Sequence, residues 1–522
     1  MQRNTVIAWS IFLVVAALLL AIHGQRMVLT NDEGIVLDAA QRMTQGQRPY
    51  IDFFTYMSPG SYWLQATAFR WFGLALWTGR LIVILDFALQ CALVFWLVAR
   101  LSSRGAGIAA VLAFAGFQIA DPGLLTAQHR WDSATLALAG VCAAVAANGL
   151  KERRSIIGAW LASGGLLAAA AWCTPSTLLA GGGVAGWLVI SSQRRRNLIP
   201  FAGGVTAVTL AAFAALASTG SLLAFFNRMF ALPQGYSALN NMPYGAIIGG
   251  YRALFEGANT FLDIAVRGLL VTCVALPAIL PVAAVGLWGV LLWRNKIPTE
   301  QRPVIGLLLV AQILFVATTW PRPDVMHLAF IAALPYALGA GALARVLPSR
   351  AGAALAMVST LLATVFTWNY VNGWNQTVPV PSPVGILRVP ADQASAVGRL
   401  LATVHAGDSL FVYPYMPIQY FLTQGKNPTQ FFALGPGSTS SESETESLVE
   451  LEARPPEWML YMQLSREEFL RIFPNGTNLG YRLERLEAWI ERNYLPVEGP
   501  SVNVGGYRLL RLAPAAESAS LR

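Results

Sequence analysis

Residues Leu74–Val98 read LALWTGRLIVILDFALQCALVFWLV, and within this run only Arg80 and Asp86 carry charge. A helix that crosses a bilayer needs about 20 mostly apolar residues, because each residue rises about 1.5 Å along a hydrocarbon core about 30 Å thick. The run is longer than this minimum. Comparable apolar runs recur along the chain between short polar junctions, so the sequence predicts a polytopic α-helical membrane protein.

The overall composition agrees with a chain whose core lies in the bilayer. Hydrophobic residues make up 55% of the 522 residues and charged residues 12%, whereas a soluble protein carries about 25% charge. The net charge of +9 does not indicate a nucleic-acid partner, because the basic residues stand in short clusters between apolar runs. All four cysteines fall in apolar runs, which argues against a disulfide framework or a zinc site. They are Cys91, Cys142, Cys173 and Cys273.

On the length criterion the sequence predicts about eleven spanning helices. The first run ends in Ala21-Ile22-His23, a poor cleavage site for a signal peptide, so we expect it to be retained as a helix. Besides Leu74–Val98, the predicted spans are Val6–Ile22, Ala106–Ala120, Ala134–Leu150, Ile156–Trp172, Leu178–Ile190, Ile199–Ser218, Ile264–Trp293, Val304–Thr319, Leu328–Ala344 and Ala351–Trp368.

Basic clusters stand at alternate junctions between the spans, and such clusters remain in the cytoplasm. An odd number of spans then places the C-terminal end outside. We therefore predict a multi-pass protein of the cytoplasmic (inner) membrane, with its long loops on the extracytoplasmic side. The predicted cytoplasmic residues are Arg3, Arg100/Arg104, Lys151/Arg153/Arg154, Arg194/Arg195/Arg196, Arg294/Lys296/Arg302 and Arg345/Arg350. The predicted outer loops are His23–Gly73, Asp121–Ser133, Thr219–Asp263 and Trp320–His327.

The composition changes after Trp368, where charged and turn residues become more frequent. We predict a transmembrane domain over residues 1–371, a Pro-rich linker over 372–390 and a small extracytoplasmic α/β domain over 391–522. Its predicted helices are Ala391–Val404 and Arg466–Phe473, its predicted strands are Ser409–Tyr413 and Tyr507–Leu512, and the Ser/Glu-rich stretch Ser438–Ser447 is predicted to be a loop.

The first outer loop, residues 23–73, has the most informative pattern. An acidic pair, Asp32-Glu33, follows the first span directly, and apolar residues then recur at helical spacing up to Met43. This pattern predicts an amphipathic helix on the membrane surface. A second helix over Gly60–Phe72 carries five aromatic residues, a composition typical of the lipid headgroup level.

At these residues the sequence resembles the GT-C glycosyltransferases, membrane enzymes that use polyprenyl-phosphate sugars as donors. They include the protein O-mannosyltransferases and the lipid A aminoarabinose transferases, and the bacterial members of the family 39 type are most similar. The similar segments are Asp32-Glu33-Gly34, Tyr50-Ile51-Asp52-Phe53 and Ser58-Pro59-Gly60. The resemblance covers the membrane part more loosely. The sequence lacks the Glu-Lys-Pro-Pro stretch of several relatives, which leaves the role of Asp52 open.

The resemblance implies a base that takes a proton from the acceptor hydroxyl, and a carboxylate at the membrane face suits this role. Asp32 is the implied base, and Glu33 then orients it or opens the surface helix. The simpler alternative is that both carboxylates only complement the positive end of a helix dipole.

A leaving polyprenyl phosphate needs positive charge or strong hydrogen-bond donors on an outer loop. The best stretch is Trp320–Leu328, where Arg322 and His327 are the candidate phosphate ligands and Asp324 lies between them. The alternative is a headgroup anchor and an interfacial cap. Arg130 and Asp132 form a second group, in which Asp132 alternatively caps the next span.

Further candidates are Arg80, which either reaches the phosphate or snorkels to the interface, and Asp86, deeper in the same span. The turn at Cys173-Thr174-Pro175-Ser176 either lines a cavity or simply ends a helix. The Asn227–Tyr244 loop is a candidate cap over the acceptor.

The sequence predicts no cofactor and indicates no metal site, although a divalent metal would be compatible with the chemistry. The expected partners are a polyprenyl-phosphate-linked sugar donor, a glycan, lipid or protein acceptor, and the bilayer, with no nucleic acid. The resulting hypothesis is an inverting sugar transfer at the outer membrane face. Two alternatives stay open: a polysaccharide polymerase or ligase, which differs in donor size, and a transporter with Arg80 and Asp86 as its midplane site.

Overall fold

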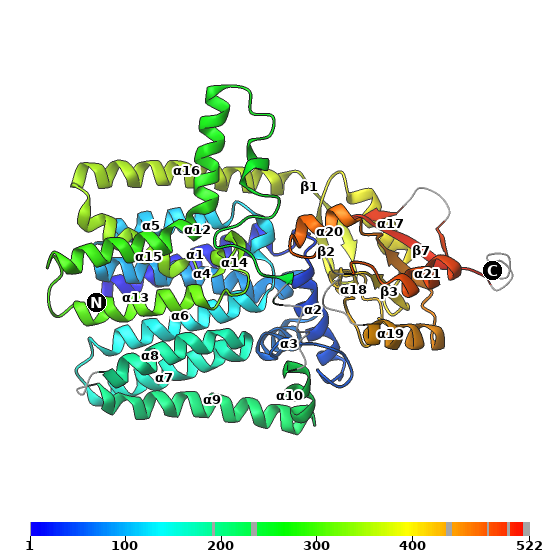
Figure 1. Cartoon of the computed structure of the whole chain (residues 1–522), viewed down its shortest axis with the longest axis horizontal. Helices are drawn as coiled ribbons and strands as arrows, with labels where there is room; N and C mark the ends of the chain where they lie inside the picture. The colour runs from blue at the N-terminus through cyan, green and yellow to red at the C-terminus, as the bar shows by residue number, and fades with distance from the viewer. Residues whose placement is uncertain are drawn as a thin grey trace.

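The computed structural model describes residues 2–190, 194–230, 237, 239–434, 441–477, 480–497 and 502–514. A helical bundle, in which most helices are roughly parallel and one green segment projects sideways, forms one end of the elongated molecule, and a region containing β-sheet forms the other (Figure 1). Helices α2 (Asn31–Thr44) and α3 (Gly60–Phe72) lie between the two. We call residues 377–514 the C-terminal region.

Eleven described helices correspond to the eleven predicted spans. Of these, α1, α4, α7, α9, α12 and α16 are long and apolar enough to cross a membrane, and the other five are shorter or less apolar. The eleven are α1 (Gln2–His23), α4 (Leu76–Leu101), α5 (Arg104–Gln118), α6 (His129–Ala147), α7 (Arg153–Cys173), α8 (Leu178–Ile190), α9 (Leu198–Ser218), α12 (Phe261–Trp293), α13 (Arg302–Ala317), α15 (Ala333–Val346) and α16 (Ser349–Asn375).

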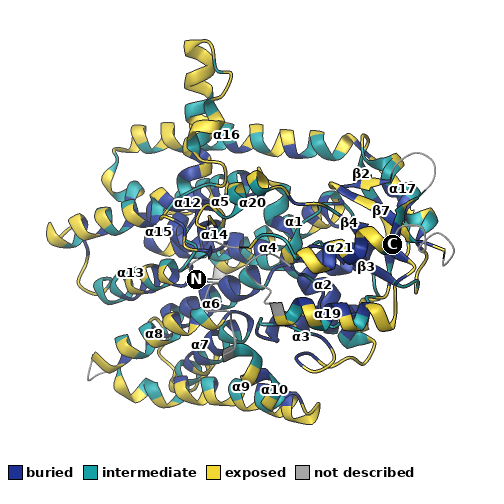
Figure 2. Cartoon of the chain, turned by 45° about the vertical axis from the view of Figure 1, so that its right-hand side comes forward, coloured by how far each residue is buried: buried dark blue, intermediate teal, exposed yellow. Residues whose placement is uncertain are grey.

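Helix α4 is the central helix of the bundle, with α1, α5, α6 and α15 packed around it. Its apolar side chains fill the main core, whereas the outer helices direct large apolar side chains outward: Leu13, Leu210 and Leu361 are 63%, 60% and 65% exposed. Figure 2 shows this contrast between the buried interior and the largely exposed α16. Such an outward apolar surface is stable in lipid and not in water.

The two predicted helices of the first outer loop both form, but α2 does not lie on an open surface. Every residue from Glu33 to Arg42 is buried, because the C-terminal region covers the polar face that the sequence pattern assigns to water. The expected surface helix is therefore an interior one. Helix α3 matches its expected bounds and exposes Trp71 and Phe72 near its end.

The C-terminal region contains a five-stranded mixed sheet. Strand order is β3-β4-β7-β5 with β6 paired to β7, and only the β3–β4 pair is parallel. The strands are β3 (Leu410–Tyr413), β4 (Trp458–Tyr461), β5 (Tyr494–Pro496), β6 (Asn503–Val504) and β7 (Tyr507–Leu512). The helices are α17 (Ala394–Thr403), α18 (Ile418–Thr423), α19 (Ser441–Ala453), α20 (Arg466–Ile472) and α21 (Glu484–Asn493).

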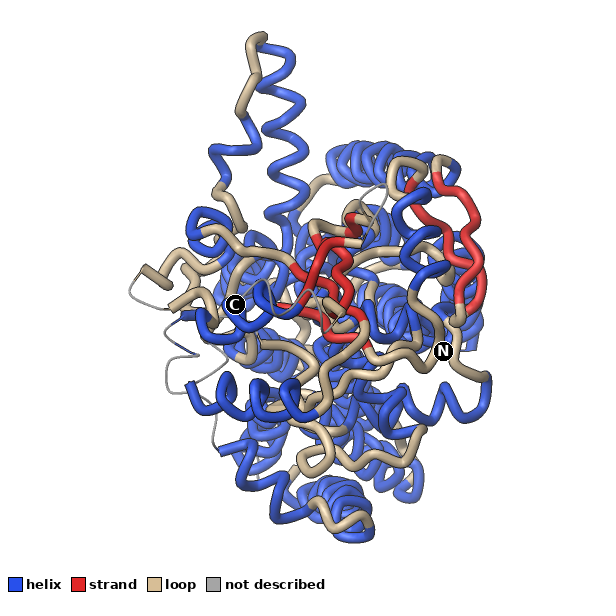
Figure 3. The backbone as a smooth tube through the Cα atoms, turned by 90° about the vertical axis from the view of Figure 1, so that its right-hand side faces the viewer, coloured by secondary structure: helices blue, strands red, loops and turns tan. Residues whose placement is uncertain are grey.

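Two segments differ from the local expectation. The Pro-rich stretch expected to be a linker forms an antiparallel hairpin of β1 (Thr377–Ser382) and β2 (Gly385–Pro390), which lies apart from the main sheet (Figure 3). The predicted Ser/Glu-rich loop was wrong over Ser441–Ser447, because this part begins α19; residues 438–440 lie outside the described residues. Acidic residues in the first turn of α19 favour its N-terminus.

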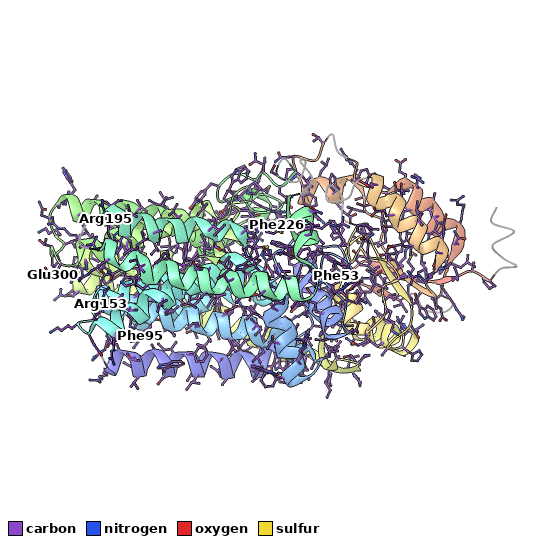
Figure 4. All side chains as sticks on the ribbon, turned by 90° about the horizontal axis from the view of Figure 1, so that it is seen from below. Phe53, Phe95, Arg153, Arg195, Phe226 and Glu300 are labelled. Atoms are coloured by element: carbon purple, nitrogen blue, oxygen red, sulfur yellow. The ribbon has the colours of Figure 1, made fainter. Side chains whose placement is uncertain are left out.

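The C-terminal region packs directly on the first outer loop. The Gln424 side-chain amide donates to the Gln41 side chain of α2 over 2.9 Å, and the rings of Phe69 and Phe421 stack with centroids 5.5 Å apart. The opposite end of the bundle carries Arg153 and Arg195, far from Phe53 at the junction (Figure 4). The molecule thus has a basic end and an end that carries the C-terminal region.

Candidate functional site

The first turn of α2 places two neighbouring carboxylates in opposite environments. Glu33 has no exposed surface and forms two parallel hydrogen bonds with Arg80 of α4, with N–O distances of 2.7 and 2.9 Å. Arg80 is equally buried, and its Nη1 group donates to the backbone oxygens of His23 (3.1 Å) and Arg26 (2.5 Å). The Glu33–Arg80 pair therefore ties α2 to α4 and to the end of α1, and Arg80 presents no surface to a ligand.

Asp32, in contrast, is exposed, and its carboxylate has no hydrogen bond or ion pair with any described residue. The backbone that carries it is fixed: the Ala127 amide lies 3.4 Å from a Glu33 carboxylate oxygen, and the Thr30 and Thr126 hydroxyls lie 3.4 Å apart. Asp32 is thus an unpaired carboxylate on a rigid support, which is what a base for an incoming hydroxyl requires.

Asp52, the alternative carboxylate of this loop, is engaged on the surface. Its oxygens accept from the backbone and guanidinium of Arg48 over 2.7 to 3.0 Å. These side-chain hydrogen bonds lower the pKa of Asp52, although its partial burial raises it. A carboxylate with a lowered pKa is a weaker base, so the geometry favours Asp32 over Asp52.

The second outer loop lies beside α2 and leads to a polar pocket. Arg130, in the first turn of α6, lines this pocket with His327, Thr174 and Ser176. His129 Nδ1 lies 2.8 Å from the Thr174 hydroxyl, so the turn after α7 is fixed against the start of α6. The pocket thus gathers basic and hydroxyl side chains from three separate segments, and we call it the polar pocket.

The segment before α15 places its three candidates in one cluster. Asp324 accepts from Arg322 Nε over 2.8 Å, and its other oxygen lies 2.7 Å from His327 Nδ1. It also accepts from the backbone amide of His327 over 2.9 Å and so caps the short helix α14 (Val325–Phe330). The Asn240 side-chain oxygen accepts from Arg322 over 3.1 Å. Asp324 therefore orients both Arg322 and His327.

Burial and charge set the protonation of this cluster. Burial raises the pKa of Asp324, but the hydrogen bond and charge of His327 and the bond from Arg322 outweigh it and lower the pKa to about 2. Burial and the positive charge of Arg130 lower the pKa of His327, and Asp324 offsets part of this. Asp324 is consequently an ionised acceptor, so His327 carries its proton on Nδ1 and directs Nε2 away from Asp324.

Asp132 and Asp86 lie together, one on α6 and one on α4. Asp132 is buried, with Asp86 and Ser61 of α3 as its side-chain neighbours. The cap residue of α6 is Gln128, so the simpler expectation that Asp132 caps this helix was wrong. The carboxyl pair therefore lies where α3, α4 and α6 meet.

Sequence reasoning missed several residues of this site. Thr318 and Thr319 also line the polar pocket, and Asn240 contacts Arg322 from the loop proposed as a cap. Residues 239–244 of that loop run along Pro321 and Pro323, and residues 227–230 end the helix α10 (Leu222–Phe230). Residues 231–236 and 238 lie outside the described residues. The sequence contains no signal for Thr318 and Thr319. The turn at Thr174-Pro175-Ser176 after α7, which it did mark, supplies two other residues of the pocket. Within the described residues, no three His, Cys, Asp or Glu side chains gather as a metal site requires.

Comparison with solved structures places this arrangement in a known fold. The structure of ArnT from Cupriavidus metallidurans bound to undecaprenyl phosphate aligns with a TM-score of 0.57 and 12% identity, covering 97% of this chain and 98% of that one. The chain has the GT-C fold. The oligosaccharyltransferase AglB from Archaeoglobus fulgidus, in complex with an inhibitory peptide and a dolichol-phosphate, aligns with a TM-score of 0.50 and 11% identity, covering 87% and 69%.

Comparison of sequences finds no match, because no family model and no curated protein matches this chain. The alignment with ArnT nevertheless runs over nearly the whole of both chains, so the GT-C fold includes the C-terminal region and not only the bundle. The expectation drawn from Asp32, Glu33 and the two helices of the first loop is confirmed at the level of the fold.

Proposed function

We propose that this chain is a glycosyltransferase that moves a sugar from a polyprenyl-phosphate carrier to an acceptor hydroxyl at the membrane face next to the C-terminal region. One observation carries the proposal: the segment Thr126–Ala127, just before Arg130 of the polar pocket, contacts Thr30 and Glu33 on either side of the unpaired Asp32. The shared fold with a protein bound to undecaprenyl phosphate supports the class of donor.

The proposed reaction is an inverting displacement. The acceptor hydroxyl oxygen forms a bond to the anomeric carbon while the bond between that carbon and the phosphate oxygen breaks. Asp32 takes the hydroxyl proton, and polyprenyl phosphate leaves with one more negative charge. We assign the stabilisation of that growing charge to Arg130 and His327, which line the polar pocket, and to Arg322, which shares Asp324 with His327. Such stabilisation is usually the largest component of catalysis. Arginine suits this role because its fork of donors matches phosphate oxygens.

Glu33 and Arg80 have a positioning role in this proposal. Their pair is fully buried and leaves no donor for a phosphate, so it fixes the first turn of α2 and thereby the Asp32 carboxylate. Asp324 plays the corresponding part for Arg322 and His327. Asp52 stays outside the mechanism, paired with Arg48.

We also infer that all eleven bundle helices cross the membrane, because α5, α6 and α15 pack on α4 and because α8 and α13 pack on α6. The end with Arg153 and Arg195 then faces the cytoplasm of a bacterial inner membrane, following the bias of basic residues. The C-terminal region and the polar pocket face the opposite side. Single cysteines at the exposed positions Asp32 and Glu152 test this orientation. An impermeant thiol reagent added to intact cells should label the first and not the second.

Asp32→Asn tests the base. The substitution keeps the shape of the side chain and removes its ability to take a proton, so the transfer rate should fall by about 100-fold or more. The donor is the polyprenyl-linked sugar that accumulates in a deletion strain, and the measurement is its consumption by purified protein in liposomes. Asp52→Asn, in the same loop, is the matched control and should keep most of the rate. The reverse result would move the base to Asp52.

Arg130→Ala, Arg322→Ala and His327→Ala test the phosphate ligands. Each should weaken the binding of a short-chain polyprenyl phosphate, by about tenfold or more for the arginines. Arg492→Ala, an exposed arginine of α21 away from this site, is the control. A transporter with its site at Arg80 and Asp86 would bind the phosphate equally well in all three variants, and that result would overturn the proposal.

A further inference from the structure

Arg322 is held by a residue of the C-terminal region as well as by its own loop. Its guanidinium carbon lies 5.9 Å from the centroid of the Phe473 ring, a contact within the range of cation–π attraction. Asp324 and Asn240 engage two of its nitrogens from the membrane side. Three segments that are distant in sequence therefore meet at this one guanidinium.

The segment that carries Phe473 is well anchored. Ser465 and Glu468 form a reciprocal capping box that starts α20, and Phe469 is fully buried. Phe473 follows α20 and packs on Phe469, with ring centroids 5.4 Å apart. Figure 1 shows α20 on the side of the C-terminal region that faces the bundle. The position of the Phe473 ring is thus determined by the C-terminal region.

The α20 segment also contacts the loop that supplies Asn240. Leu239 packs with Leu464 and Phe469, and the Asn475 side-chain amide donates to the backbone oxygen of Asn241. Backbone hydrogen bonds then join this loop to the Arg322 segment. Met242 N donates to Pro321 O (3.1 Å), Gly245 N to Pro323 O (2.8 Å), and Val325 N to Ala246 O (2.9 Å). The α20 segment therefore contacts Arg322 directly and also supports its other partner.

We propose that Phe473 is a positioning residue, whose ring holds the Arg322 guanidinium at the edge of the lipid-phosphate site. The inference rests on the proposed function, because it assigns Arg322 to the phosphate. An arginine side chain has many rotamers, and binding of a phosphate must restrict them. A ring that already restricts the side chain therefore lowers the entropy cost of phosphate binding. The C-terminal region thereby acts on donor affinity through Arg322, without touching the lipid.

The test is a double-mutant cycle on the affinity for a short-chain polyprenyl phosphate, with Phe473→Leu, Arg322→Ala and the double variant of the full chain. Phe473→Leu keeps apolar volume and removes the aromatic face, so affinity should fall about three- to tenfold. It should change nothing further when Arg322 is already alanine. Phe473→Trp, which keeps an aromatic face, should restore affinity. The Michaelis constant for the donor should rise more than the maximal rate falls.

Trp374→Leu is the matched control, because it removes a similar contact, with Arg388 at 4.6 Å from the ring centroid, away from the polar pocket. It should leave phosphate affinity unchanged. An equal loss from Phe473→Leu in the Arg322→Ala background would overturn this inference alone, since Phe473 would then act as ordinary packing. Unchanged affinity in Arg322→Ala itself would instead remove Arg322 from the phosphate site, and the inference with it.

Discussion

Two carboxylate–arginine groups of this protein are built alike and surrounded differently. We call Glu33 with Arg80 the sealed pair, since neither side chain has exposed surface, and Asp324 with Arg322 and His327 the open cluster, since the basic side chains are 14–15% exposed. In both, a buried carboxylate orients a cation. His327 of the open cluster lines the polar pocket, whereas neither Glu33 nor Arg80 has surface that a ligand could contact.

The difference indicates how the two groups are used. An ion pair with no exposed surface has lost all its hydration, and its mutual attraction must compensate for that loss. Such a pair stabilises one geometry and binds nothing. The open cluster has a single carboxylate, Asp324, beside Arg322 and has Arg130 nearby, so it carries a local excess of positive charge that an anion can neutralise. Three substitutions separate these roles.

Glu33→Gln should have the largest effect, and on stability. It leaves the buried Arg80 charge without its counter-charge, which costs about 3–5 kcal/mol in comparable buried pairs. Thermal unfolding of the detergent-solubilised protein is the measurement. Glu457→Gln is the control, because Glu457 and Arg511 form a pair in which both side chains are more than half exposed, and it should change stability little. A Glu33→Gln protein of normal stability would show that the pair is not the anchor of α2.

Gly34→Ala should have an intermediate effect on stability. It tests whether the close contact between α2 and the C-terminal region keeps the sealed pair away from water. A Cβ atom on Gly34 would lie 2.0 Å from the Ile418 backbone nitrogen, so α2 and the C-terminal region would have to separate. Overpacking of this kind costs about 1–3 kcal/mol. Gly158→Ala on α7 is the matched control, since a Cβ there meets nothing within 4 Å. If Gly34→Ala matched the control in unfolding temperature and transfer rate, α2 would not depend on this close contact.

These interior contacts also mark the limit of what the sequence could predict. Local patterns were sufficient for α3 and for β7, whose observed bounds equal the expected ones, because helix and strand periodicities depend on neighbouring residues. They were sufficient, too, for the six helices that are long and apolar enough to cross a membrane. The burial of α2 was not predictable in this way, since its polar face is covered by α18, a helix far along the chain.

The same reasoning applies to the site. The sequence identified Asp32, Arg130, Arg322 and His327 as candidates, and the fold brings them to one end of the bundle. It could not separate Arg80 from them, because the partner of Arg80 is Glu33, 47 residues earlier. Asn240 lies 82 residues from Arg322, and Phe473 belongs to another region of the chain. Contacts across such separations follow from packing, which no local pattern encodes.

The smallest expected effect is a pH dependence that only the open cluster should show. Burial first, and then Arg130, lower the pKa of His327, so its ring is neutral near pH 7 with the proton on Nδ1 toward Asp324. Its Nε2 atom can then donate to a phosphate only after taking up a second proton. A bound phosphate raises the pKa of His327, because an opposite charge favours the imidazolium.

Binding therefore takes up a proton, and by linkage the affinity for polyprenyl phosphate should rise as the pH falls toward the pKa of the free protein. The phosphate itself gains a proton with a pKa of about 6, which weakens binding in the same range. The ratio of the affinity of the wild type to that of His327→Gln cancels this contribution, since Gln does not titrate. That ratio should increase between pH 8 and pH 6, by up to about tenfold for each unit by which the phosphate raises the pKa of His327.

Calorimetry in two buffers of different ionisation enthalpy should detect the proton taken up by the wild type and less of it in His327→Gln. A ratio that stays constant with pH would mean that His327 contacts the phosphate without changing its charge, or does not contact it, and Arg130 and Arg322 would then hold the phosphate alone.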